Sequence, residues 1–291
     1  KQCYINYYQE SPEYAPLAIG GYLPLDSVYA YDPLPAALSP EEQKYIIGTQ
    51  ANVWGEYIQT PETFEYMAFP RLLAQAEVQW TQPAQKDFPS FTRRLDKEFR
   101  RLDLRHVNAC RNFYEVNFSG AWNAAQEAYE VSLRTFCPDA EIHYALNDSA
   151  ITTSSPRYEG PIRLEQNAMV YAAVFRDGKP LGKVTRKGFT VNKATGRPYT
   201  CVPEAGWEHL NKGFGLADGV RGYARDMRRW ISFYQDTVHI TINLGKPCPV
   251  KEVSFASLWR PWNEIWPARA MSVSVSTDGK EFVRVGSKEL H

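Results

Sequence analysis

Several features that would define a function are missing from this sequence of 291 residues. Its 33 Lys and Arg balance its 33 Asp and Glu, so no basic surplus indicates nucleic-acid binding. No apolar run approaches the ~18 residues needed to span a bilayer. The five cysteines show no CxxC spacing and the five histidines no HExxH motif, which argues against a disulfide framework or a zinc site. We therefore expect no metal, no cofactor, no nucleic-acid partner and no membrane span in this chain.

Aromatic residues, in contrast, are abundant. The chain has 8 Trp, 18 Tyr and 14 Phe, and 44% of its residues are hydrophobic, which is ample for a folded core. Its length corresponds to about two domains at roughly 150 residues per domain. Ordinary core packing can account for aromatic residues, but Trp-rich surfaces also suit sugars, which have apolar faces and polar rims.

The first part of the chain, up to about residue 105, alternates strand-like and helix-like segments. Residues 4–8 and 45–48 predict two strands, the second buried and continuing to Trp54. Helix starts are indicated by a capping-box pattern at residues 39–42 and by Thr60-Pro61. A further helix is predicted from apolar residues at helical spacing, namely Phe91, Leu95, Phe99 and Leu102. This alternation predicts a parallel α/β layer.

From about residue 137 the pattern changes to short alternating strands. Residues 141–146 and 170–175 predict a first antiparallel β-sandwich, and residues 238–245 and 271–276 predict a second. A break near residues 196–205, with Gly196-Arg197-Pro198 and Pro203, separates the two sets. We expect two separate sandwiches that hold most of the stability of the chain.

The most informative stretch is Asn52-Val53-Trp54-Gly55-Glu56. It places an indole and a carboxylate two residues apart, just past an apolar strand, so both side chains should emerge on the same side. An aromatic floor with an acceptor for hydroxyl hydrogens is what a saccharide pocket requires. A core Trp beside a carboxylate at a helix N-terminus is the alternative. Tyr4 and Asn6 have the same form at the end of the earlier strand.

Together these segments resemble the family 20 glycoside hydrolases, the β-N-acetylhexosaminidases. The similarity runs in order over about 100 residues, and its last segment, Phe69-Pro70-Arg71 through Trp80, resembles the F/Y-P-R-x-x-A-x-A-E-x-x-W helix of that family. The matching segments are residues 4–6, 28–33, 47–56 and 69–80. The resemblance implies a (β/α)8 barrel, of which this chain would hold the last two strands and their helices.

The resemblance also implies a role for each site residue. Tyr4 matches the tyrosine whose hydroxyl holds the substrate acetamido group, and Asn6 matches an Asp or Asn that contacts the sugar. Trp54 matches the tryptophan behind the acetamido group, and Glu56 the carboxylate that binds sugar hydroxyls. In the family the 2-acetamido oxygen attacks the anomeric carbon while a Glu, next to an orienting Asp, protonates the leaving oxygen. This chain contains no adjacent Asp-Glu pair, so we expect a C-terminal portion of the enzyme that is inactive alone.

The β segments extend the same resemblance. We assign residues 1–135 to the barrel portion with trailing helices, 136–200 to a small sandwich like those that follow hexosaminidase barrels, and 201–291 to a discoidin-like sandwich that is cut short. Trp259, Trp262 and Trp266 lie in or beside one loop of the last domain and are candidate accessory carbohydrate contacts. Packing of the loop by these aromatic rings is an equal alternative.

The leading interpretation is therefore part of an exo-acting β-N-acetylhexosaminidase with N-acetylhexosamine-containing glycans as partners. The alternative is a non-catalytic carbohydrate-binding or adhesion module that uses only the Trp-rich β domains. No signal peptide can be identified in the sequence, and a periplasmic, cell-surface or secreted location is implied only by the family.

Overall fold

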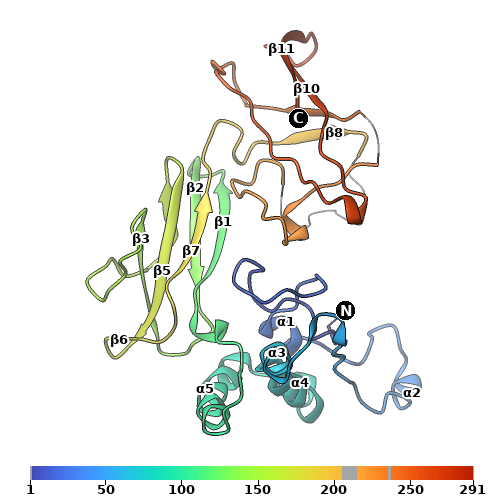
Figure 1. Ribbon diagram of the computed structural model, residues 1–291, viewed down its shortest axis with the longest axis vertical. Helices are drawn as coiled ribbons and strands as arrows, with labels where there is room; N and C mark the ends of the chain where they lie inside the picture. The colour runs from blue at the N-terminus through green and yellow to red at the C-terminus, as the bar shows by residue number, and fades with distance from the viewer. Residues whose placement is uncertain (1, 205–214, 235–236, 291) are drawn as a thin grey trace. The chain divides into compact units, whose positions relative to one another are not determined.

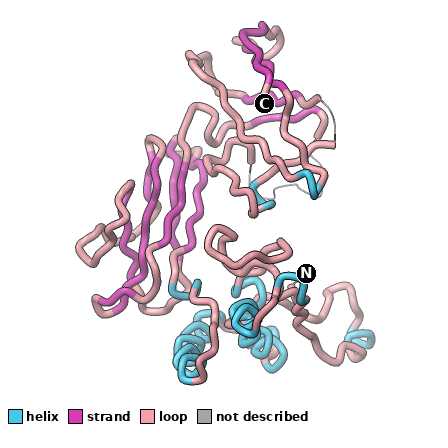
Figure 2. Tube along the Cα trace, viewed as in Figure 1, coloured by secondary structure: helices cyan, strands magenta, loops and turns pink. Residues whose placement is uncertain are grey.

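The computed structural model describes residues 2–204, 215–234 and 237–290. The chain forms two compact units. The first unit comprises Lys1–Phe118, Leu133–Gly160 and Val170–Arg186, and the second comprises Ser119–Ser132, Pro161–Met169 and Lys187–His291. Helices longer than one turn lie in the first unit, whereas the later part of the second is mostly loop with short strands (Figures 1 and 2).

The helices of the first unit begin where the sequence places their caps. Ser39 accepts a hydrogen bond from the Glu42 backbone N–H and the Glu42 carboxylate accepts one from Ser39, so the expected capping box is present. Pro70 separates two helices, as a proline inside a helical pattern should. The α-helices are α1 (Leu25–Tyr29), α2 (Pro40–Gln43), α3 (Pro61–Ala68), α4 (Arg71–Trp80) and α5 (Phe88–Leu104).

Helix α5 confirms the predicted spacing of apolar residues. Asp87 caps its N-terminus by accepting from the Ser90 backbone N–H. Phe91, Leu95, Phe99 and Leu102 are all buried on one face. Phe99 packs against Phe113 and Tyr114 of the following 3-10 turn, Asn112–Tyr114, with ring centroids 5.3 and 5.1 Å away. This face therefore anchors the helix in the first unit.

The two predicted N-terminal strands differ from expectation. Residues 4–8 make only isolated parallel bridges, from Tyr4 to Asn52 and from Tyr8 to Tyr22. The prediction of a buried strand at residues 45–48 is wrong, because Tyr45 is 83% and Ile47 100% exposed. An apolar run is buried only where another element covers it, and none of the described residues covers this one.

The antiparallel strands of the first β block agree closely with the sequence prediction. Strand β3 (Glu141–Leu146) pairs with β5 (Ala168–Arg176), with Ile142 opposite Val174. Strand β5 also pairs with β6 (Lys179–Pro180) and β7 (Thr185–Phe189). Strand β5 is the best buried of these, because neighbours flank it on both edges.

Strand structure begins earlier than expected. Residues 117–134, at the end of the range assigned to the barrel portion with trailing helices, form the strands β1 (Asn117–Asn123) and β2 (Ala128–Arg134), and β2 pairs with β4 (Ile162–Leu164). In β2, Tyr129, Val131 and Leu133 alternate with more exposed residues, which is the period of a strand.

The second β block forms two separate ribbons. Strand β8 (Tyr199–Val202) pairs with β9 (His239–Ile242), and β10 (Ala270–Val275) pairs with β11 (Val283–Glu289). Within the described ranges, no sheet joins these strands to the strands before residue 190, as expected for two distinct β blocks.

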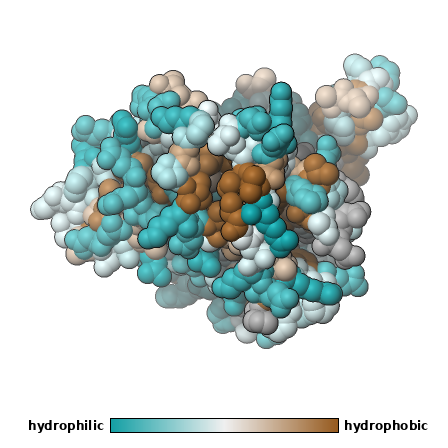
Figure 3. All heavy atoms as spheres, turned by 90° about the horizontal axis from the view of Figure 1, so that it is seen from above, coloured by the Kyte–Doolittle hydropathy of each residue, from teal (hydrophilic) through white to brown (hydrophobic). Residues whose placement is uncertain are grey.

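Burial is unevenly distributed along the chain. Among the described residues, every buried apolar side chain lies between Ile5 and Phe189. Many apolar side chains are instead exposed, and Figure 3 shows several of them gathered among polar residues on the face seen from above. The second β block buries no apolar side chain in its described part, so burial does not favour the expectation that this block holds much of the stability.

Two further searches cover the described residues only. None of the helices there is both long enough and apolar enough to cross a bilayer. The same residues contain no cluster of three or more His, Cys, Asp or Glu side chains suited to a metal ion.

Candidate functional site

The segment that contains Tyr4 and the segment that leads to Trp54 run side by side in the same direction. The Ile5 N–H donates to the Asn52 carbonyl at 3.0 Å, and the Asn52 N–H donates to the Cys3 carbonyl at 2.6 Å. Tyr4 is thereby opposite Asn52 in a parallel bridge. Because both segments run the same way, the residues that follow the bridge leave from the same edge, which is the arrangement expected for the ends of neighbouring parallel strands.

Tyr4 and Asn6 occupy different environments on the first segment. The Tyr4 ring is partly buried and stacks on Tyr7, with centroids 5.6 Å apart and planes 16° apart. Asn6 is only 5% exposed, and its side-chain carbonyl oxygen has no hydrogen-bond partner among the described residues. A buried acceptor of this kind usually has a partner. Asn6 can therefore accept a hydrogen bond from a bound molecule.

Trp54 and Glu56 follow the second segment and reach solvent. Trp54 is 54% exposed, which contradicts the alternative of a core tryptophan. Glu56 lies in the 3-10 turn Gly55–Tyr57 and is exposed. An exposed indole offers an apolar platform, and a nearby carboxylate accepts hydrogen bonds from hydroxyl groups.

Side chains of helix α4 hydrogen-bond to both segments. Arg71, which makes two of these bonds, was not predicted as a site residue. Arg71 is fully buried and donates to the carbonyls of Ile5, Tyr7, Leu23 and Met67. One and two turns later on the same helix, Gln75 donates to the Thr49 hydroxyl at 3.2 Å and Gln79 to the Thr49 carbonyl at 2.8 Å. The sequence signal for Arg71 was its place in the Phe69-Pro70-Arg71 motif.

A second polar cluster lies in the first unit, with Glu10 and Glu115 buried and Lys183 about half exposed. The Lys183 ammonium is 3.0 Å from the Glu115 carboxylate and 3.9 Å from that of Glu10, which also accepts from the Tyr66 hydroxyl. Burial and the Glu10 charge raise the pKa of Glu115 to about 7, against the opposing effect of Lys183. A single sequence could not reveal this cluster, because its members lie far apart along the chain.

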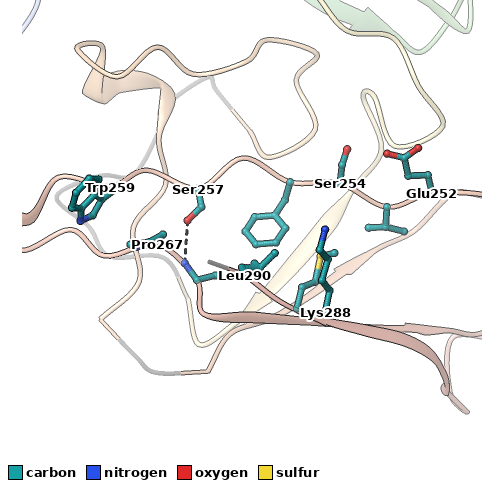
Figure 4. A pocket seen from close by; sticks show the side chains of 11 residues that line it. Glu252, Ser254, Ser257, Trp259, Pro267, Lys288 and Leu290 are labelled. Atoms are coloured by element: carbon teal, nitrogen blue, oxygen red, sulfur yellow. Dashed lines mark hydrogen bonds between the residues drawn. The ribbon is translucent and has the colours of Figure 1, made fainter.

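The three candidate tryptophans of the second unit are exposed, at 66% for Trp259, 74% for Trp262 and 69% for Trp266. They lie around the 3-10 turn Pro261–Asn263. Trp259 lines a groove of about 770 Å³ together with Phe255, Met271 and Lys288, and the Ser257 hydroxyl there accepts from the Ala268 N–H at 3.0 Å (Figure 4). Trp262 and Trp266 are not part of its lining.

Parts of the chain are similar to known proteins. Residues 1–83 match the profile of the glycosyl hydrolase family 20 catalytic domain, and residues 131–189 match a profile described as Fn3 associated. The "Beta-hexosaminidase" of Porphyromonas gingivalis (strain ATCC BAA-308 / W83) is 36% identical over 189 residues, which cover 63% of this chain and 24% of that protein. The chain thus spans about a quarter of that relative.

Two solved structures are similar to parts of the chain. The GH20 exo β-N-acetylglucosaminidase of Vibrio harveyi, in complex with N-acetylglucosamine, is 34% identical, with a TM-score of 0.33 over 37% of this chain and 17% of that one. The GH20 β-N-acetylhexosaminidase of Streptomyces coelicolor A3(2) is 25% identical, with a TM-score of 0.34 over 38% of this chain and 22% of that one.

The N-terminal part of the chain is therefore a portion of a glycoside hydrolase catalytic domain. More particularly, residues 1–83 match the family 20 catalytic domain, which is the family that the motifs of this segment indicated.

Proposed function

We propose that this chain belongs to an exo-acting β-N-acetylhexosaminidase that removes terminal N-acetylhexosamine residues from glycans by substrate-assisted, retaining catalysis. The observation that carries the proposal is the parallel pairing of the Tyr4 and Asn52 segments within the stretch that matches the family 20 catalytic profile. In this proposal the two segments are the last two strands of a (β/α)8 barrel, whose sites lie at the carboxyl ends of the strands.

Each of the four residues has a distinct task in this proposal. The Tyr4 hydroxyl donates to the acetamido oxygen as that oxygen attacks the anomeric carbon and charge builds on the ring that forms. The free carbonyl of Asn6 accepts from the sugar. Trp54 packs against the apolar face beside the acetamido group, and Glu56 binds sugar hydroxyls. The proton for the leaving oxygen comes from a Glu that, with its neighbouring Asp, lies outside these 291 residues.

Hydrolysis by the isolated chain is the first test. We expect no release of the aglycone from a chromogenic N-acetyl-β-glucosaminide, because no adjacent Asp-Glu pair is present and a positioned proton donor contributes about 10²–10⁴ in rate. The longer enzyme, which supplies that pair, should hydrolyse the same substrate. Turnover by the isolated chain at the rate of the longer enzyme would show that another carboxylate here is the acid.

The groove beside Trp259 favours a second candidate function, a non-catalytic carbohydrate-binding module. Its lining combines the aromatic rings of Phe255 and Trp259 with the polar groups of Glu252, Ser254 and Lys288 (Figure 4). Titration of the chain with N-acetylglucosamine oligomers, followed by tryptophan fluorescence, distinguishes the two sites. Loss of binding in Trp259→Ala but not in Trp54→Ala would assign binding to the groove.

The remaining assignments follow the same resemblance. We infer that the second β block is a discoidin-like sandwich and that Trp262 and Trp266 provide further glycan contacts. We also infer a periplasmic, cell-surface or secreted location, where glycan substrates are accessible to a hydrolase.

A further inference from the structure

Arg71 is a buried cation of the first unit whose hydrogen bonds to the described residues all go to main-chain carbonyls, while its Nε–H has no partner among those residues. Its side chain is 0% exposed. One terminal nitrogen, Nη1, donates to the Tyr7 carbonyl at 2.9 Å and to the Leu23 carbonyl at 3.0 Å, and the other, Nη2, donates to the carbonyls of Ile5 and Met67. Each terminal nitrogen carries two hydrogens, so all four are used.

Two of these four acceptors flank a proposed sugar contact. The Ile5 carbonyl belongs to the peptide group that precedes Asn6, the Tyr7 carbonyl belongs to the residue that follows Asn6, and Tyr4 precedes both. Ile5 is held from both sides, because its N–H donates to Asn52 and its carbonyl accepts from Arg71. The backbone around Asn6 is therefore fixed at three points, whereas the Asn6 side-chain oxygen itself has no partner in the described part of the chain.

Burial of a cation at the start of a helix costs free energy. Taking a guanidinium out of water is unfavourable unless hydrogen bonds and charge partners compensate. Here the compensation comes from carbonyl dipoles, and burial lowers the pKa of Arg71 from its usual value. The planar fork of arginine reaches four acceptors at once, which the point charge of lysine cannot do in the same geometry.

We propose that Arg71 is a positioning residue for the sugar site, which sets the orientation of the Ile5–Tyr7 backbone and hence of Asn6 and Tyr4. This inference rests on the proposed function. Gln75 and Gln79, on the same face of α4, hold Thr49 of the partner segment. One helix face thus fixes both segments from which the site residues emerge.

The test in the longer enzyme compares Arg71→Lys with Arg101→Lys, which makes the same chemical change in an exposed ion pair with Glu98. We expect kcat to fall at least 30-fold in Arg71→Lys with KM changed less than about 5-fold, because misplacement of catalytic groups by about 1 Å costs on the order of 10² in rate. Arg71→Gln, which loses the charge as well, should fall further. The control should keep both constants.

The outcomes separate this inference from the proposed function. If the unaltered enzyme does not hydrolyse N-acetylhexosaminides, the proposed function is wrong. If the unaltered enzyme is active and Arg71→Lys keeps its kcat, only the role of Arg71 is wrong.

A measurement in the 291-residue chain tests the positioning without catalysis. Hydrogen exchange at the Ile5 amide should be at least 10-fold faster in Arg71→Lys, while exchange in α5 stays unchanged. Equal exchange at Ile5 in the two proteins would overturn the inference. If the variant unfolds, the unaltered chain still decides the question, because hydrogen-bond couplings between the Arg71 Nη nitrogens and the carbonyl carbons of Ile5 and Tyr7 should be detectable by NMR. Their absence would also overturn it.

Discussion

At the scale of single residues, the four proposed sugar contacts differ in how firmly they are held. Tyr4 is supported by the stacked Tyr7 ring and Asn6 by the backbone bonds around it, whereas Trp54 and Glu56 lie at the surface. Groups that must meet developing charge need to be fixed before the reaction begins. The supported pair is therefore suited to the transition state, and the exposed pair to initial capture of the sugar.

The Tyr4 hydroxyl gives a direct test of this division. In the longer enzyme, Tyr4→Phe should lower kcat by about 10²–10³, the value of one preorganised donor, while KM changes little. Kinetics on an aryl N-acetylglucosaminide measure both constants. Tyr7→Phe is the matched control, because it removes a hydroxyl but keeps the stacked ring. Unchanged turnover in Tyr4→Phe would remove that residue from the catalytic list.

At the scale of elements, the packing of helix α5 against the following turn is made through the Phe99 ring. Phe99 is 1% exposed between Phe113 and Tyr114, and the Arg111 guanidinium lies 5.0 Å from its centroid. Phe99→Ala should lower the free energy of unfolding of the first unit by about 3–5 kcal/mol, because it leaves a cavity in the packed face. Urea denaturation followed by circular dichroism measures the loss.

Leu104 provides the matched control for Phe99 because it is on the same helix but 81% exposed. Leu104→Ala should change the free energy of unfolding by less than about 0.5 kcal/mol. Similar losses in the two variants would mean that the buried face does not anchor the helix.

The cluster of Glu10, Glu115 and Lys183 predicts a dependence of stability on pH. The pKa of Glu115 is raised from 4.5 to about 7 in the folded protein, so folding retains a proton that the unfolded chain releases in this range. The free energy of unfolding should therefore fall as the pH rises from about 4.5 to about 7, by on the order of 1–3 kcal/mol.

Substitution isolates this contribution. Glu115→Gln should remove the decline, which is measured as the difference in urea midpoint from the unaltered chain at pH 5, 6 and 7. Glu41→Gln alters an exposed carboxylate paired with Lys44 and should not change the slope. A slope in Glu115→Gln equal to that of the unaltered chain would contradict the assignment to this carboxyl group.

The sequence predicted some elements well because their signals are local. The capping box before α2, the apolar spacing of α5 and the alternation in β3, β5, β9 and β10 are all periodic or cap patterns. The hairpin of β1 and β2 was missed although its alternation was present. The predicted buried strand at residues 45–48 failed for a different reason, since burial depends on what covers a segment.

The residues of the candidate site could be predicted where they lie in sequence motifs, but their tertiary contacts could not. Tyr4, Asn6, Trp54 and Glu56 were predicted from sequence motifs, and a parallel bridge joins Tyr4 to Asn52. Three of the four carbonyl acceptors of Arg71, and the partners of Lys183, come from segments distant in the chain. Such pairings depend on the tertiary fold, which one sequence does not encode in any local pattern.

At the scale of the whole molecule, stability should be concentrated before residue 190. The described residues beyond Phe189 bury no apolar side chain, and segments with few buried contacts open most readily. In limited proteolysis followed by mass spectrometry, a fragment that contains residues 61–189 should outlast every fragment that contains β10 and β11. Survival of β10 and β11 after loss of α4 and β5 would contradict this.

The ribbon of β10 and β11 also affects how molecules of this protein meet one another. Strand β11 pairs with β10, and all seven of its residues are exposed, including Val283 and Val285. The outer main-chain groups of such a strand form a template on which a strand of another molecule can add. Crowding should therefore favour self-association through this edge, and a charged residue in place of Val285 is the substitution that would keep concentrated solutions dispersed.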